Sequence, residues 1–228
     1  MKMIMQCCHS HYYFRPQHFF ALMGFCVLLG LSGCGQDKKA VDNDRPAGEE
    51  QAANQYSYEN VFEEVLRQVQ ADPKDENALY HLADLYDRQG QYQKAVETYR
   101  KVLVINPNRD YVYFKMGTAY SRLGQPVQAV EVLAEATSHL PENPVVWNNL
   151  GIAYGKLGRV DKEVESLHRA LKIRPRYASA RFNLAVVYLK KGDKAAAKAQ
   201  YDELKTFDET LAQELLSRFN AGEGQHSK

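Results

Sequence analysis

Residues 147–154, which read WNNLGIAY, decide the fold because their pattern recurs along the chain. Three columns, one of Tyr, one of Gly and one of Pro, keep a spacing of 34 residues without any insertion. Their members are Tyr86, Tyr120, Tyr154 and Tyr188; Gly90, Gly124, Gly158 and Gly192; and Pro73, Pro107, Pro141 and Pro175. A fixed period of this length is the signature of a repeat protein, in which each unit packs against its neighbours. We therefore predict four repeats, at 76–109, 110–143, 144–177 and 178–211.

Each repeat is expected to form two helices. Large apolar residues recur at helical spacing around the Tyr column, and a small residue stands between them. The large residues are Leu79, Tyr113 and Trp147, with Leu82, Met116, Leu150 and Leu184; the small ones are Ala83, Gly117, Gly151 and Ala185. A small residue allows the second helix of the repeat to approach closely. The Gly column falls at the end of each first helix, where a left-handed residue is least costly for glycine, and Pro126 suits the first turn of a second helix.

Residues 147–154 resemble the W-x2-L-G-x2-Y opening of the tetratricopeptide repeat family. The resemblance implies an all-α fold, a right-handed superhelical solenoid of helix-turn-helix repeats. Arg181 replaces a large apolar residue and Glu209 replaces the last proline, which is normal for a terminal repeat. Glu163 stands in a column of small residues otherwise held by Ala. A buried unpaired carboxylate is costly, so we expect Glu163 to tilt outward or to find a basic partner.

The segments on either side of the repeats are expected to cover the ends of the array. A helical stripe precedes Pro73, as a leading half repeat at 58–75 would; it consists of Phe62, Val65, Leu66 and Val69. After the repeats, Leu211, Leu215 and Phe219 recur every fourth residue, which predicts a closing helix and tail at 212–228. Solenoids need polar-faced ends for solubility, so we expect the array to be complete within this chain.

Residues 1–33 predict a lipoprotein signal peptide. They contain two basic residues, Lys2 and Arg15, and no acid. The segment 19–31 holds 13 uncharged residues, fewer than the roughly 20 that a membrane-spanning helix needs. Leu31-Ser32-Gly33-Cys34 then resembles the bacterial lipobox, which implies a diacylglycerol on Cys34 and a mature protein that begins there. The alternatives are an uncleaved apolar anchor and a translation start at Met3, Met5 or Met23.

Residues 34–57 are expected to form the lipidated cysteine and a disordered tether, because 35–55 is almost wholly polar or small and cannot bury a face. Gly35 follows Cys34, in place of the Asp that resembles an inner-membrane retention signal, so the outer membrane is favoured. We expect a lipoprotein of the bacterial cell envelope, in the outer membrane and facing the periplasm, that is attached to the membrane through its lipid anchor.

The composition and the motifs give no sign of catalysis. Lys+Arg 29 against Asp+Glu 28 gives a formal net charge of +1, so nucleic acid is not an expected partner. The glycines of 151–157 superficially suggest a phosphate loop, but the segment lies within a predicted helix and lacks the required Ser or Thr. Cys34 would be the only cysteine of the mature chain, and its histidines show no paired metal-ligand spacing. We expect no enzyme activity, cofactor, metal or small-molecule substrate.

The face of each first helix opposite the buried one lines a concave groove in the family that the sequence resembles. Arg88, Arg122, Lys156 and Lys190 place a base at the same position of every repeat, which the dipole at the end of a helix explains equally well. His81, Lys115, Asn149 and Asn183 likewise place a donor, and in some family members an Asn at this position bonds the backbone of an extended peptide. The predicted groove residues are Tyr80, His81, Arg88, Phe114, Lys115, Arg122, Asn148, Asn149, Ile152, Lys156, Phe182, Asn183, Val186 and Lys190.

These expectations lead to a protein-binding function. The first hypothesis is a membrane-anchored interaction module whose groove binds an extended, apolar-to-acidic peptide segment of another envelope protein. The second is a pilotin-like assembly factor for a pilus or secretion complex, which rests on family analogy alone. An enzyme is the third and least favoured hypothesis, and a turnover that survives purification would revive it.

Overall fold

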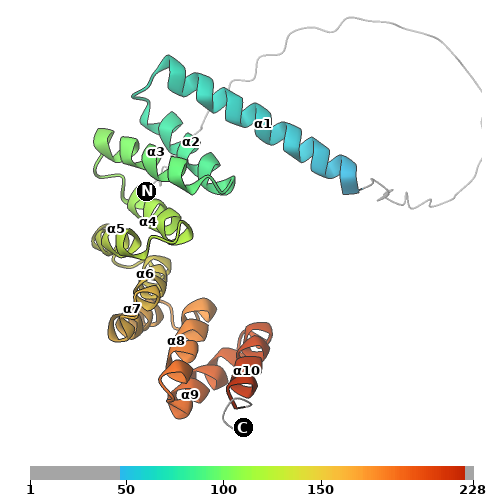
Figure 1. Ribbon diagram of the computed structural model, residues 1–228, viewed down its shortest axis with the longest axis vertical. Coiled ribbons are helices and arrows are strands. Elements are labelled where there is room, and N and C mark those ends of the chain that lie inside the picture. The colour runs from blue at the N-terminus through green and yellow to red at the C-terminus, as the bar shows by residue number, and fades with distance from the viewer. Residues whose placement is uncertain (1–46, 224–228) are drawn as a thin grey trace, which may run out of the picture. The chain divides into compact units, whose positions relative to one another are not determined.

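The computed structural model describes residues 47–223, and the side chains of residues 59–220. This part of the chain consists of helices and contains no strand (Figure 1). The helices are α1 (Ala47–Ala71), α2 (Glu76–Arg88), α3 (Tyr92–Ile105), α4 (Asp110–Arg122), α5 (Pro126–His139), α6 (Pro144–Lys156), α7 (Val160–Ile173), α8 (Ala178–Lys190), α9 (Lys194–Lys205) and α10 (Glu209–Glu223). Each of the four repeat ranges predicted from the sequence contains one helix pair. The prediction of an all-α repeat solenoid is confirmed.

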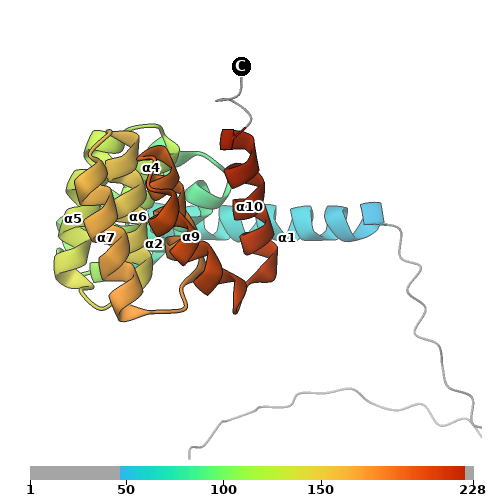
Figure 2. The ribbon, with the colours of Figure 1, turned by 90° about the horizontal axis from the view of Figure 1, so that it is seen from below.

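The helices form two layers. Each helix packs mainly against the helices before and after it in the chain. Figure 2 shows the second helices α5 and α7 on one side and α10 on the other, with the first helices α4 and α6 between them. The first helices therefore provide one continuous face of the solenoid, and the second helices provide the opposite face.

Close contact within a repeat depends on the column of small residues. A methyl group added at Gly117 would lie 2.6 Å from Cγ of Leu133, which is fully buried in α5. At Gly151 in the next repeat, an added methyl group would lie 3.0 Å from Cγ of Leu167. The large side chain of the second helix thus occupies the space that a glycine leaves free, as the sequence predicts.

The turn between the two helices of a repeat has the same geometry each time. Gly124 has a φ of 71°, in the left-handed region that favours glycine. The next residue, Gln125, donates its backbone N–H to the carbonyl oxygen of Tyr120 at 3.0 Å, which closes the last turn of α4. Pro126 then begins α5, where its missing N–H costs no helical hydrogen bond.

The turn before each of three first helices is held by a long side chain with a hydrogen-bond donor. Tyr113 Oη, Trp147 Nε1 and Arg181 Nη2 donate to the carbonyl oxygen of the proline six residues earlier, at 3.0, 2.8 and 2.7 Å. These residues occupy equivalent positions 34 residues apart. Arg181 is therefore no loss of function at this position, because three different side chains provide the same bond.

The first helix of the structure starts earlier than the sequence predicts. The expected disordered tether extends to residue 57, but α1 begins at Ala47. The segment 47–53 reads AGEEQAA, and Glu, Gln and Ala favour a helix strongly enough to extend the one that packs on the repeats. The C-terminal part of α1 contacts α2, where Phe62 and Tyr86 lie edge to face with ring centroids 5.5 Å apart.

The last helix, α10, packs against α8 and α9. Ala212 and Leu215 of α10 are fully buried in a cluster with Ala185 and Leu204. The helix begins at Glu209, three residues before the range predicted for it. It thereby covers the apolar face that the fourth repeat would otherwise expose.

The membrane predictions concern a part of the chain that the structure does not describe. The signal peptide at 1–33, Cys34 and the tether as far as residue 46 lie outside the described residues. None of the helices within 47–223 is long and apolar enough to cross a membrane.

Candidate functional site

One face of α4 gathers much of the predicted groove. Its residues are spaced i, i+3, i+4, i+7 and i+11, so they form one stripe along the helix. They are Tyr111, Phe114, Lys115, Thr118 and Arg122. Tyr111 is 45% exposed at one end of the stripe, and Arg122 is exposed at the other.

A pocket of about 350 Å³ lies where α4 meets α6. Its lining residues are Thr118, Ser121, Arg122, Asn149, Ile152 and Lys156. Four of these, Arg122, Asn149, Ile152 and Lys156, are groove residues predicted from positions 34 residues apart. The structure brings them together because α4 and α6 are the first helices of adjacent repeats, so equivalent positions become neighbours.

The two cations of this pocket have different partners. Arg122 Nη1 donates to Oδ2 of Asp87 at 2.7 Å, and its guanidinium also lies over the ring of Tyr92. Lys156 Nζ donates to the backbone carbonyl oxygen of Ser121 at 2.8 Å. A carbonyl oxygen does not neutralise an ammonium group, so the pocket keeps positive charge at Lys156.

The amides of the donor column are bonded between repeats. Asn149 Nδ2 donates to Oγ1 of Thr118 at 3.3 Å, and Asn183 Nδ2 donates to Oδ1 of Asn148 at 3.0 Å. Asn148 Nδ2 in turn donates to Oδ1 of Asn149 at 3.3 Å. An amide nitrogen carries two hydrogens, so Asn149 retains one N–H that can bond a ligand in the pocket.

Four rings lie at the other end of the α4 stripe, and we call them the aromatic cluster: Tyr80, His81, Tyr111 and Phe114. The ring centroids of Tyr80 and His81 are 6.0 Å apart, and those of Tyr111 and Phe114 are 5.2 Å apart. Tyr80 and Tyr111 both interact electrostatically with the Lys115 ammonium group, which places the two ring pairs beside each other.

An ion-pair network lies among these rings. Asp84 accepts hydrogen bonds from Lys115 Nζ at 2.6 Å and from Arg88 Nε at 2.7 Å. Burial tends to raise the pKa of the Asp84 carboxyl, but Lys115 and Arg88 outweigh burial and hold that pKa below its ordinary value. Burial likewise tends to lower the pKa of Lys115, but Asp84 raises it overall. Both groups are therefore charged at neutral pH.

Some predicted groove residues are not on an open surface. Asn148 is 4% exposed and Phe114 is 8% exposed, because their column faces the first helix of the next repeat. Phe182 and Val186 pack with the cluster that α10 covers, and the Arg218 guanidinium of α10 lies 5.0 Å from the Phe182 ring centroid. The groove that remains accessible therefore runs over the first three repeats.

Lys190, the last base of its column, is exposed and faces a carboxylate that the sequence did not assign to the groove. Glu163 reaches from α7 over Gly155 of α6, and a methyl group added at Gly155 would lie 2.6 Å from Cδ of Glu163. Burial raises the pKa of Glu163, and the charge of Lys190 only partly offsets this. Glu163 therefore stays half-buried and has a basic neighbour.

Sequence reasoning missed Asp87 and Ser121, which accept from Arg122 and Lys156. They occupy equivalent positions, 34 residues apart, and each lies 35 residues before the base that it binds. Asp87 is buried, so its place on the first helix gave no indication of a surface role. A search for acceptors one repeat and one residue before each base would have found both.

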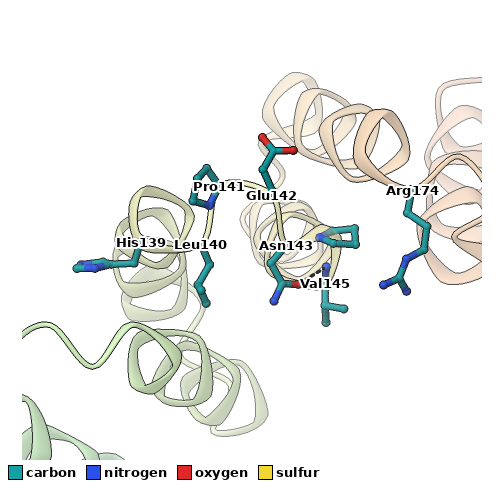
Figure 3. A pocket seen from close by; sticks show the side chains of 8 residues that line it. His139, Leu140, Pro141, Glu142, Asn143, Val145 and Arg174 are labelled. Carbon is teal, nitrogen blue, oxygen red and sulfur yellow. Dashed lines mark hydrogen bonds between the residues drawn. The ribbon is translucent and has the colours of Figure 1, made fainter. Parts of the chain in front are cut away.

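The largest pocket lies away from the first-helix face (Figure 3). It has a volume of about 570 Å³ beside the turn between α5 and α6, and Arg174 reaches toward that turn from the end of α7. His139 points away from Val145 in this view, since it bonds Asp110 at 2.9 Å and stacks on Tyr113. Its polar groups already have partners, so we assign no ligand to this pocket. Among residues 59–220, no group of three or more side chains could hold a metal ion.

Solved structures of repeat proteins resemble this chain. A fragment of MamA from Desulfovibrio magneticus RS-1 superposes with a TM-score of 0.65 at 20% identity, over 71% of this chain and 91% of that one. YrrB, described as a TPR protein with an unusual peptide-binding site, gives 0.63 at 18% identity over 74% and 88%. TTC0263 from Thermus thermophilus, a thermophilic TPR protein, gives 0.56 at 26% identity over 76% and 94%. No curated protein sequence matches significantly.

Sequence models of the family match almost all of the helical array. A model described as TPR repeat matches residues 84–124. Models described as tetratricopeptide repeat match residues 62–97, 114–178 and 164–212. Because these matches together span 62–212 and the solved structures share the fold, the chain belongs to the tetratricopeptide repeat family.

Proposed function

We propose that this protein is a membrane-anchored interaction module that binds an extended peptide segment of a cell-envelope partner along its first helices. The pocket between α4 and α6 carries this proposal, because it joins a base, an amide donor and an apolar side chain: Lys156, Asn149 and Ile152. Tetratricopeptide repeats bind protein partners, and YrrB, which shares the fold, is described as having a peptide-binding site. A binding module also agrees with a face that extends over several repeats.

The chemistry of the pocket favours a segment that is both apolar and acidic. Lys156 has a carbonyl oxygen as its partner, so a ligand carboxylate there would gain a charge-assisted hydrogen bond. Asn149 can donate its second N–H to a peptide carbonyl oxygen, whatever the side chain of the ligand. Ile152 offers an apolar contact beside them. Affinity from the amide and selectivity from the bases are therefore separable.

The proposed location rests on the sequence from Leu31 to Cys34, which resembles a lipobox. A Cys34→Ala variant should lose acylation and either remain unprocessed or become soluble. Intact-mass analysis of the native protein tests the anchor directly. A mass without a diacylglycerol group would refute the lipoprotein assignment and leave the peptide-binding proposal standing.

The partner can be identified by crosslinking and pull-down from a solubilised bacterial envelope. Recovery of a client protein with an extended acidic segment would support the interaction module. Recovery of a multimeric ring of a pilus or secretion complex would instead favour the pilotin-like assembly factor.

Calorimetric titration with the identified segment then tests the pocket. Asn149→Ala should weaken all bound segments similarly, by about 0.5–1.5 kcal/mol for one lost hydrogen bond. Arg122→Glu with Lys156→Glu should weaken acidic segments steeply and change the salt dependence of binding. Reversal of two exposed bases on second helices, Lys101→Glu with Lys172→Glu, changes the net charge equally and should leave affinity nearly unchanged. Equal effects of the two charge reversals would place the partner outside this pocket.

A further inference from the structure

We propose that the aromatic cluster is a second subsite of the same groove, which takes an uncharged aromatic or aliphatic side chain about five residues from the acidic group of the ligand. The inference rests on the proposed function and adds the identity, charge and spacing of a second anchor residue. It is carried by three observations: exposed rings, a neutral surrounding, and a continuous stripe that joins the cluster to the pocket.

The rings offer an apolar surface that the fold itself leaves open. Tyr111 is 45% exposed although it packs on the nearly buried ring of Phe114. His81 is exposed beside Tyr80. Large exposed rings that lie together on the accessible part of a binding face are characteristic of anchor sites. At the fourth repeat, by contrast, α10 covers the apolar residues.

The charges around the cluster select a neutral occupant. Lys115 and Arg88 both bind Asp84. Arg109 binds Glu76 and lies over the ring of Tyr80 at 4.7 Å from its centroid. A charged ligand group would have to compete with these pairs, whereas the pocket around Lys156 keeps positive charge. An uncharged side chain therefore suits the cluster, and a carboxylate suits the pocket.

The distance between the two subsites follows from the geometry of α4. Tyr111 and Arg122 are eleven residues apart on one face of the helix, and at about 1.5 Å per residue their Cα atoms lie about 16 Å apart along its axis. An extended peptide advances about 3.3 Å per residue, so about five residues span this distance. A ligand that fills both subsites must therefore place its two anchors at a restricted separation.

A random dodecapeptide library displayed on phage tests the spacing without knowledge of the natural client. Selection on the full chain should enrich peptides in which an aromatic or aliphatic residue and an Asp or Glu are four to six residues apart, in one order along the peptide. The exposed pair Tyr111→Ser with His81→Ala should abolish the preference for the apolar residue and keep the preference for the acid. Val104→Ser, which removes an 84% exposed apolar side chain of α3, is the matched control and should select the same peptides as the native chain.

The affinities of a selected peptide give the second measurement. The Tyr111→Ser and His81→Ala pair should bind it about three- to tenfold more weakly, the effect of losing ring contacts of ordinary strength. If this variant selects the same peptides as the native chain, or if the acid is enriched without an apolar residue at fixed spacing, the second subsite is wrong and the proposed function stands. If no acidic peptide is enriched on any variant, both fail.

Discussion

Glu163 and Gly155 are two residue-level exceptions to the repeat that the structure joins into one feature. The column of Glu163 otherwise holds Ala95, Ala129 and Ala197, all fully buried. The column of Gly155 otherwise holds Asp87, Ser121 and Leu189. The missing side chain at Gly155 leaves the space that the Glu163 carboxylate occupies. A large residue in a small column is thus accommodated by a small residue on the facing helix.

This pairing predicts that substitutions at the two positions are not additive. Glu163→Ala removes a half-buried carboxylate whose burial is only partly offset by Lys190, so it should raise the free energy of unfolding by about 0.5–2 kcal/mol. Gly155→Ala gains roughly 1 kcal/mol of helix propensity, but in the native chain its methyl group displaces the carboxylate. The gain from Gly155→Ala should therefore be larger in the Glu163→Ala background. Urea unfolding of the four proteins measures this, and equal gains in both backgrounds would show that the two residues do not interact.

The same carboxylate predicts a pH dependence of stability. The pKa of Glu163 is raised in the folded protein from its ordinary value of about 4.5. As pH rises above that value, the unfolded chain ionises first, so the native state loses stability until pH passes the folded pKa. Glu163→Gln cannot ionise. Its stability advantage over the native chain should therefore grow from pH 4 toward pH 7 and then remain constant, and a difference that shrinks over this range would contradict the burial of an ionised carboxylate.

At the scale of the helix pair, the closest approach is between α4 and α5. Gly117 faces Leu133, and an added methyl group would overlap its Cγ at 2.6 Å and Cδ2 at 2.9 Å. The contact between Gly151 and Leu167 in the next pair is looser, at 3.0 and 3.2 Å for the equivalent atoms. The two pairs thus differ in how much additional volume they can accept.

Gly117→Ala should therefore destabilise the protein although alanine favours a helix. Overpacking a buried contact typically costs about 1–3 kcal/mol, which exceeds the gain of roughly 1 kcal/mol in propensity. Gly151→Ala is the matched control, with the same substitution at an equivalent position, and should lose less. Urea unfolding followed by circular dichroism compares the two. A larger loss for Gly151→Ala would mean that the spacing of helix pairs does not limit stability here.

The helix pairs were predictable from sequence because each local signal recurs with one period. Gly124 marks the end of a first helix, Pro126 marks the start of a second, and Gly117 permits their contact. The start of α1 was not predictable in this way, since the segment from Ala47 precedes the apolar stripe and only helix propensity continues through it.

At the scale of the whole array, sequence located the accessible face but not the partners of its side chains. The repeat pattern predicts Asn149 and Asn183 as donors to a ligand, yet both amides bond neighbouring repeats. Such bonds depend on the rotation between one repeat and the next, which a linear pattern does not contain. For the same reason the sequence could not show that α10 covers Phe182.

The position of α10 predicts what happens when it is removed. Truncation after Asp208 would expose Ala185, Leu204 and the apolar side chains packed around them, which the helix now covers. Solenoids with an open apolar end lose the last interface energy and associate through that end. The truncated protein should unfold at lower urea concentration and show a mass that rises with concentration in sedimentation velocity.

A point variant separates the loss of packing from the loss of the helix. Leu215→Ser keeps α10 but removes a fully buried side chain from its contact with α8 and α9. It should lower the free energy of unfolding by about 2–5 kcal/mol, as large core truncations do, and release α10 more often from the fourth repeat. Gln213→Ser, at an exposed position of the same helix, should change stability by less than about 0.5 kcal/mol. If the truncated protein stays monomeric with an unchanged urea midpoint, α10 is not needed to close the array, and the stability of the fourth repeat must come from α8 and α9 alone.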